Sequence, residues 1–194
     1  ENSSRIGNNL IERTQAINGV ISVDGIYVNL YNPINNDSWG PNVIDVYGLP
    51  DKLNGILEEN QKGIIFGKFD LKRWKSGNYV IVSQPLYTSE AYSAGDMIDI
   101  GNSSGKLYEI MLVTEKPIYF ASSIYGNKFK AYVPVNEFKN NYLSDARDAT
   151  ICKLIVDVDD SSDETIKTEL EKIFNQDNGF RVQARSEKLN DLRQ

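Results

Sequence analysis

Strand, helix and strand follow one another in residues 150–185, TICKLIVDVDDSSDETIKTELEKIFNQDNGFRVQAR. Apolar side chains alternate with others over residues 152–158, which is the period of a strand with one apolar face. Ser161 and Glu164 have the spacing of a capping box, and the apolar residues after them recur at helical spacing. Residues 180–185 alternate again, so the segment predicts a βαβ unit.

This βαβ unit needs partner strands from elsewhere in the chain, because a sheet of only two strands is marginally stable. Residues 20–30 and 43–47 have the composition of extended chain. We therefore expect one subdomain built from both chain ends, residues 1–47 and 148–194, with residues 48–147 inserted into it.

The inserted region predicts a small β-rich α/β subdomain, which makes the fold class α+β. Its strands are expected between clusters of Gly, Pro, Asn and Ser, at residues 64–66, 79–83, 97–100, 107–113 and 129–133. The five residues Gly101 to Gly105 have a length typical of hairpin loops, which favours antiparallel pairing of the strands on either side.

Helices are expected at three further places. Residues 5–17 have a weak apolar stripe that ends at Asn18-Gly19. A second helix begins at Pro50-Asp51, and Asn136 is suited to cap a third over residues 137–142. The pair Asp24-Gly25 is expected to interrupt the extended chain of residues 20–30.

Composition excludes several classes of function. The 194 residues have a net charge of −6, which disfavours nucleic acid as a partner. The chain has no histidine, which excludes mechanisms that depend on an imidazole. Cys152 is the single cysteine, and its place in an alternating strand predicts a buried, inert side chain.

The two ends predict a piece of a longer protein. The chain begins with Glu1 rather than a methionine, and residues 186–194 are predicted to form a helix with no Gly or Pro to end it. The longest apolar runs are far below the roughly 20 residues that cross a bilayer.

Acidic residues are densest between Asp157 and Glu164 and superficially follow the spacing of a calcium loop. Ser162 stands where that loop needs glycine, and Thr168 where it needs a bidentate glutamate. We interpret the run as acidic residues at a helix start, where the helix dipole favours them. No metal or cofactor is predicted.

Two other motifs have ordinary structural interpretations. The loop at residues 101–107 resembles a phosphate loop, but three residues separate its glycines and Leu107 replaces the magnesium-binding hydroxyl. Glu58-Glu59 and the pair Asp145 and Asp148 are interpreted as solvent-exposed faces in preference to an acid–base pair of carboxylates. No catalytic residue is predicted.

Aromatic and apolar residues in loops indicate a surface that contacts a partner. Residues 117–125 are unusually apolar for a connection between strands. The alternative is that this segment forms another core strand. The candidate partner-contact residues are Trp39, Tyr119, Phe120, Ile124 and Tyr125.

The order of these features resembles the MacB-like extracytoplasmic (periplasmic core) domain of FtsX-like ABC transporter permeases. The resemblance covers nearly the whole chain, and Gly95-Asp96 after the strand 79–83 is its best single marker. Residues 118–128 depart from it by their length. Its segments are residues 18–23 (NGVISV), Gly63, 79–83 (YVIVS), 94–98 (AGDMI), 108–110 (YEI), 131–135 (AYVPV) and 150–185.

The resemblance implies a domain on the extracytoplasmic face of the cell membrane, between two transmembrane helices. It also implies a porter-like subdomain made from both chain ends and an inserted α/β subdomain. Adenosine triphosphate would be hydrolysed on a separate cytoplasmic ABC ATPase. The implied partners are that ATPase, a second permease subunit, and an extracytoplasmic adaptor or peptide cargo. The function implied is export or mechanotransmission.

Two alternatives stay open from the residues alone. One is a secreted or surface-anchored module that binds a peptide or glycan through its tyrosine-rich loops. The other is an enzyme of unknown type. Apolar segments of about 20 residues flanking the chain in its full-length protein would favour the permease domain.

Overall fold

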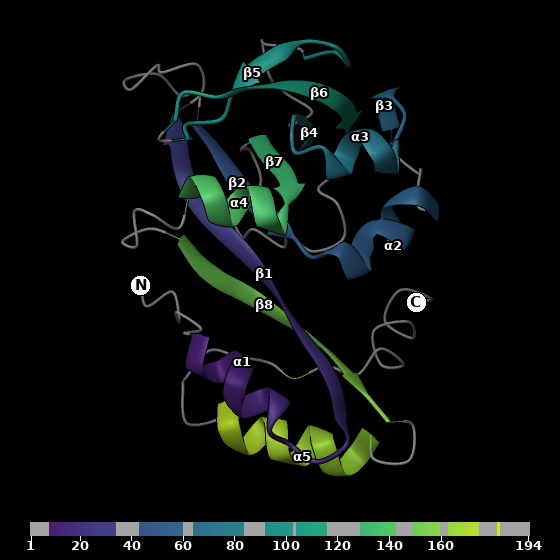
Figure 1. The fold of residues 1–194 in the computed structure, drawn as a ribbon, viewed down its shortest axis with the longest axis vertical. Coiled ribbons are helices and arrows are strands. Elements are labelled where there is room, and N and C mark those ends of the chain that lie inside the picture. Colours follow the sequence, from purple (N-terminus) through teal and green to yellow (C-terminus); the bar gives the residue numbers. More distant parts are fainter. Residues whose placement is uncertain are drawn as a thin grey trace. The chain divides into compact units, whose positions relative to one another are not determined.

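The computed structural model describes residues 8–33, 43–59, 64–83, 92–102, 104–115, 129–142, 149–159, 163–174 and 182. The chain divides into two compact units, whose elements are labelled in Figure 1. Unit 1 consists of Glu1–Gly25 and Ile151–Gln194, and unit 2 of Ile26–Thr150. Both ends of the chain therefore belong to one unit. These bounds differ from those of the expected subdomains, since unit 2 also includes residues 26–47 and 148–150.

Unit 1 combines the beginning and the end of the chain. It contains α1 (Asn8–Gln15), the first part of β1 (Val20–Pro33), most of β8 (Ala149–Val158) and α5 (Asp163–Phe174). Strands β1 and β8 are neighbours in the sheet. Beyond the end of β8, the Asp159 backbone N–H donates to the Gly19 carbonyl at 2.9 Å. A strand from the start of the chain thus pairs with β8, the strand that begins the predicted βαβ unit.

The core of unit 1 follows the predicted stripe of α5. Ile166, Leu170 and Phe174 are buried on α5, and Leu10 is buried on α1. Ile173 is half-buried. The expected capping box at residues 161–164 and the expected strand at 180–185 lie outside the described residues, except for Asp163, Glu164 and Val182.

Unit 2 contains a mixed sheet. Its strands are the second part of β1 with β2 (Val43–Leu49), β3 (Ile64–Gly67), β4 (Tyr79–Ser83), β5 (Met97–Asp99), β6 (Leu107–Thr114) and β7 (Phe129–Pro134). The strand order is β3-β6-β4-β7-β2-β1, and β5 also pairs with β6. The pairs β2–β7 and β4–β6 are parallel, and the others are antiparallel. The predicted α+β class and the antiparallel β5–β6 hairpin are confirmed.

Four short helical elements accompany this sheet: η1 (Asp51–Leu53), α2 (Asn54–Glu59), α3 (Leu71–Lys75) and α4 (Val135–Tyr142). Helix α4 packs on β2 and β7, and Figure 1 shows it across these strands. Gly48 of β2 faces Phe138 so closely that an added Cβ would lie 2.6 Å from the Phe138 Cβ. The Phe138 ring also packs against Tyr27 and Tyr142. Phe138 is fully buried, so α4 completes the core on its side of the sheet.

Two local expectations are wrong. Asp24-Gly25 does not interrupt β1, because both residues continue the strand. Asn136 does not cap α4; it lies inside the helix, which begins at Val135 directly after the strand residue Pro134.

The interpretation of Cys152 is also wrong. Cys152 is exposed, and its neighbour Ile151 is buried at 3% exposure. Successive side chains of a strand point to opposite faces, so burial of Ile151 directs Cys152 away from that buried face. The sequence pattern placed the buried face on the wrong side at this end of β8.

Candidate functional site

The five predicted partner-contact residues, Trp39, Tyr119, Phe120, Ile124 and Tyr125, lie outside the described residues. The strands that follow them in the chain are described. Trp39 precedes β2 and the other four precede β7. These two strands are parallel neighbours, and the Cα of Ile44 is paired with the Cα of Phe129. The two chain segments that contain the predicted residues therefore enter the sheet at the same end of adjacent strands, which we call the β2–β7 sheet end.

A row of buried polar residues crosses four strands at this sheet end. Lys130 of β7 is paired with Asp45 of β2 on one side and with Ser83 of β4 on the other. Ser83 is in turn paired with Thr114 of β6. All four residues are buried, with exposures between 3% and 6%. Polar groups that are this deeply buried are stable only when they are hydrogen-bonded, so the row restricts the register of these strands.

Lys130 is the unusual member of this row. Burial lowers the pKa of its amine, and the nearby Asp45 carboxylate opposes this by raising it. A buried lysine with a carboxylate neighbour is seen both in structural ion pairs and in functional sites. Here Lys130 is 3% exposed, so the row supports the sheet end from inside and offers no surface to a ligand.

A second polar cluster is centred on Glu137 in the first turn of α4. Its Oε1 atom lies 2.5 Å from the Lys106 Nζ and accepts a hydrogen bond from the Tyr108 hydroxyl at 2.9 Å. The Asn141 Nδ2 donates to the same oxygen at 2.9 Å. The Glu137 side chain is 13% exposed and that of Lys106 is 29% exposed. We call Glu137, Lys106, Tyr108 and Asn141 the Glu137 cluster.

The turn between β5 and β6 holds Lys106 in place for this contact. The Asn102 Oδ1 accepts hydrogen bonds from the backbone N–H groups of Ser104 and Lys106, and the Asn102 Nδ2 donates to the Lys106 carbonyl. The Lys106 Nζ also donates to the Gly77 carbonyl at 2.7 Å. Gly77 has a φ of +73°, a conformation that favours glycine. The cluster thus joins the β5–β6 turn, the turn after α3 and the start of α4.

Tyr108 is a hydrogen-bond donor in this cluster. Its side chain is fully buried. Burial first, and then the Glu137 carboxylate, raise the pKa of the Tyr108 phenol well above its ordinary value. The phenol therefore stays protonated near neutral pH and donates to Glu137. The contacts of Glu137 with Lys106, Tyr108 and Asn141 give it the role of a structural ion-pair partner.

In the described part of the chain, no group of three or more His, Cys, Asp or Glu side chains is arranged to hold a metal ion. Of the predicted acidic run, Asp157 accepts a hydrogen bond from the Ser22 hydroxyl at 3.2 Å. Within the same residues, no helix is long and apolar enough to span a bilayer.

Comparison with known proteins was informative at the level of structure. No family model matches the chain, and no curated protein matches its sequence. The solved periplasmic region of MacB from Actinobacillus actinomycetemcomitans superposes with a TM-score of 0.50 at 10% sequence identity, over 95% of this chain and 81% of that one. The chain has the fold of a MacB-like extracytoplasmic domain.

A second solved structure has a comparable degree of similarity. It is the extracellular domain of the noncanonic ABC-type transporter YknZ from Gram-positive bacteria, with a TM-score of 0.49 and 15% identity over 90% of this chain and 85% of that one. The fold expected from the order of sequence segments is confirmed for the MacB-like domain. The first of these structures is described as a periplasmic region and the second as an extracellular domain.

Sequence reasoning missed the Glu137 cluster. Lys106 and Tyr108 lie 31 and 29 residues from Glu137, so no local spacing could indicate the contact. One usable signal was Asn102, which follows Gly101 in a short loop and has the residue type that folds such turns through its own side chain.

Proposed function

We propose that this chain is the extracytoplasmic domain of an FtsX/MacB-like ABC transporter permease at the cell membrane. The observation that supports this most strongly is the MacB-like fold over 95% of the chain. In this proposal the domain is not catalytic, and adenosine triphosphate is hydrolysed on a separate cytoplasmic ABC subunit or domain. A second permease subunit and that ATPase are its partners through the membrane part of the full-length protein.

The proposed mechanism is the transmission of displacement. Both ends of the chain belong to unit 1, so two flanking membrane helices would pull on one compact body. Strands β1 and β8 each contain residues of both units, which gives unit 2 two covalent connections through strands. Movement of the membrane helices on ATP binding would thus pass along these strands and serve export or mechanotransmission. We assign residues 1–47 and 148–194 to the porter-like subdomain of this architecture and residues 48–147 to the insertion.

The β2–β7 sheet end is the proposed contact region for an extracytoplasmic adaptor or a peptide cargo. The proposed contact residues are Trp39, Tyr119, Phe120, Ile124 and Tyr125. Their grouping in one region is supported by the pairing of β2 with β7, because the segments before these two parallel strands enter the sheet at the same end. Photo-crosslinkers placed at Trp39 and Tyr125 in the full-length protein should capture the partner, whereas one at the exposed Ile21 of unit 1 should not.

The location and the partner can be tested with the full-length protein in intact cells. Lys172 has a side chain that is 64% exposed, so Lys172→Cys in a Cys152→Ser background provides a thiol for a membrane-impermeant maleimide. Any cysteine outside the 194 residues is replaced by serine. The proposal expects labelling without cell lysis and co-purification of an ABC ATPase. Labelling only after lysis, or a full-length sequence with no apolar segments of about 20 residues flanking the chain, would contradict it.

A further inference from the structure

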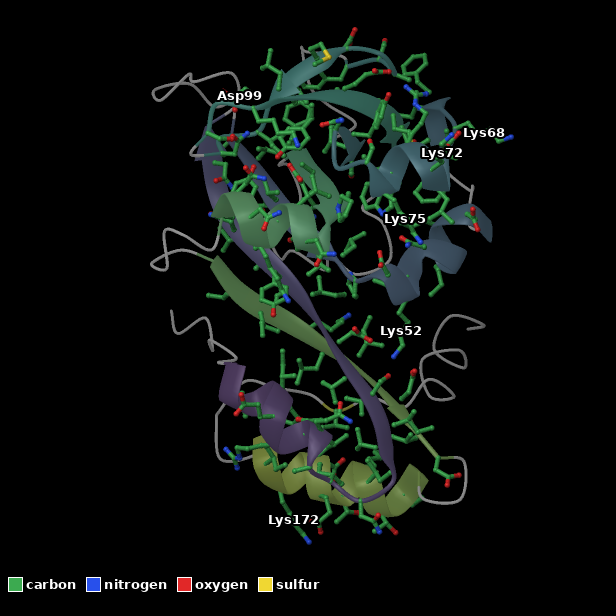
Figure 2. All side chains as sticks on the ribbon, viewed as in Figure 1. Lys52, Lys68, Lys72, Lys75, Asp99 and Lys172 are labelled. Atoms are coloured by element: carbon green, nitrogen blue, oxygen red, sulfur yellow. The ribbon has the colours of Figure 1, made fainter. Side chains whose placement is uncertain are left out.

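An exposed basic surface lies on unit 2 and is separate from the β2–β7 sheet end in the strand order. Between Lys68 and Lys75 the chain has four basic residues and one acidic residue, whereas the whole chain has a net charge of −6. Lys68, Lys72 and Lys75 are all exposed. Figure 2 labels the three side chains on the α3 side of unit 2. Positive charge is thus concentrated locally in an acidic protein.

These three lysines have no internal partner among the described residues. The neighbouring Arg73 differs, because it forms an ion pair with Glu109 at 2.5 Å and lies 4.3 Å from the centre of the Tyr79 ring. The single acid of the segment, Asp70, is also engaged. Its side chain caps α3 by accepting the Arg73 backbone N–H at 2.9 Å. The charge of the three lysines is therefore available to an external group.

Apolar side chains lie next to these lysines in the chain. Strand β3 is the last strand in the sheet order and pairs with β6, and Ile65 and Phe66 on it are 40% and 45% exposed. A register shift between Ile64 and Phe66 makes the strand irregular, which disfavours addition of a further strand at this edge. A partner would then be bound through side chains. We call Ile65, Phe66, Lys68, Lys72 and Lys75 the β3–α3 surface.

The backbone that bears this surface is firmly positioned. Gly67 has a φ of +86°, and an added Cβ there would lie 2.2 Å from the Met111 carbonyl oxygen. Trp74 lies between Lys72 and Lys75 in the chain. Its side chain is fully buried and packs against Phe69. A preorganised surface loses less conformational entropy on binding than a mobile one.

We propose that the β3–α3 surface binds an acidic segment of a partner protein that also has apolar side chains. Three exposed lysines with no partner among the described residues complement carboxylates, and Ile65 and Phe66 provide apolar area next to them in the chain. More than half of the surface of each of these two residues is covered, so neither protrudes as an anchor for a lipid layer. The inference does not depend on the proposed function.

The test uses the 194-residue chain and a fluorescein-labelled eight-residue peptide of alternating glutamate and leucine, titrated by fluorescence anisotropy at 150 mM salt. The variant Lys68→Gln, Lys72→Gln, Lys75→Gln should weaken binding at least tenfold. The matched control, Lys52→Gln, Lys167→Gln, Lys172→Gln, has the same net charge and should change binding less than twofold. Far-UV circular dichroism and thermal unfolding verify that both variants are folded.

A second variant tests the apolar part. Phe66→Ser with Ile65→Ser should weaken peptide binding about threefold to tenfold at unchanged net charge. Vesicles containing one quarter phosphatidylglycerol are titrated in parallel. Equal weakening by the two lysine variants, or no saturable binding of the peptide, would overturn the proposal. Lysine-dependent binding to the vesicles without binding to the peptide would also overturn it, in favour of a lipid headgroup.

Discussion

Lysines in unit 2 occur in two contrasting environments. In the Glu137 cluster, Lys106 is half-buried and contacts a carboxylate and the Gly77 carbonyl. On the β3–α3 surface, Lys68, Lys72 and Lys75 are exposed and have no partner among the described residues. A partly buried charge must be compensated by the protein itself, whereas an exposed charge is compensated by water. Partly buried lysines such as Lys106 therefore contribute to stability. Exposed lysines such as those of the β3–α3 surface can serve recognition at little cost to folding.

The largest change in the free energy of unfolding is expected when Glu137 is removed. Glu137→Ala removes the acceptor of the Tyr108 hydroxyl and the carboxylate partner of the Lys106 ammonium, which keeps its hydrogen bond to the Gly77 carbonyl. We expect a loss of about 2–3 kcal/mol in the free energy of unfolding. Urea unfolding followed by circular dichroism measures it.

Glu169→Ala is the matched control for that prediction. Glu169 also lies on a helix and also pairs with a lysine, Lys172, but the two side chains are 47% and 64% exposed. The control should lose no more than about 0.5 kcal/mol. Equal losses in the two variants would show that burial does not distinguish the two pairs.

The Glu137 cluster should also make the free energy of unfolding depend on pH, with an effect of intermediate size. The pKa of Tyr108 is raised in the folded protein above its ordinary value of 10.0, mainly by burial. Above pH 10 the unfolded chain releases this proton and the folded chain retains it, so the free energy of unfolding falls as the pH rises. The slope for one such group is about 1.4 kcal/mol per pH unit.

Tyr108→Phe should remove that part of the slope. The measurement is urea unfolding of both proteins at pH 8.0 and between pH 10 and 11. Tyr142 has a pKa raised mainly by burial as well, so the variant should retain some loss of stability at high pH. An unchanged slope in Tyr108→Phe would mean that the phenol does not titrate in this way.

The smallest effect is expected on the β3–α3 surface. The three Lys→Gln changes at residues 68, 72 and 75 should alter the free energy of unfolding by less than about 0.5 kcal/mol in total, because exposed side chains without partners contribute little to stability. Thermal unfolding monitored by circular dichroism is sufficient to measure it. A loss of more than about 1 kcal/mol in the free energy of unfolding would mean that these lysines make structural contacts. They would then not differ from Lys106 in their contribution to stability.

The sequence made the strands of unit 2 predictable because their apolar runs and turn residues are local signals. Residues 79–83 and 107–113, for example, are rich in apolar side chains, and turn residues lie just before each stretch, at Gly77-Asn78 and at Gly105. Helix α3 was missed because it has only five residues, too few for an apolar stripe. Its available signal was Asp70, an N-cap residue type before Leu71 and Trp74 at helical spacing.

Long-range polar contacts could not be predicted in the same way. The row formed by Asp45, Lys130, Ser83 and Thr114 depends on which strands are neighbours, and the order of strands in the sheet does not follow the order in the chain. The burial of Lys130 could not be predicted from the sequence either, because a single lysine in an apolar run is usually on the exposed face of its strand. The five predicted partner-contact residues stay a prediction.

Gly48 determines more than the local packing of one ring. Phe138 follows Glu137 directly on α4, so the hydrogen atom that stands in place of a side chain at position 48 fixes how near α4, and with it the carboxylate, comes to the sheet. A methyl group at this position would act as a spacer between helix and strand. The position of the Glu137 carboxylate thus depends on the contact that the next residue, Phe138, makes with the smallest residue in β2.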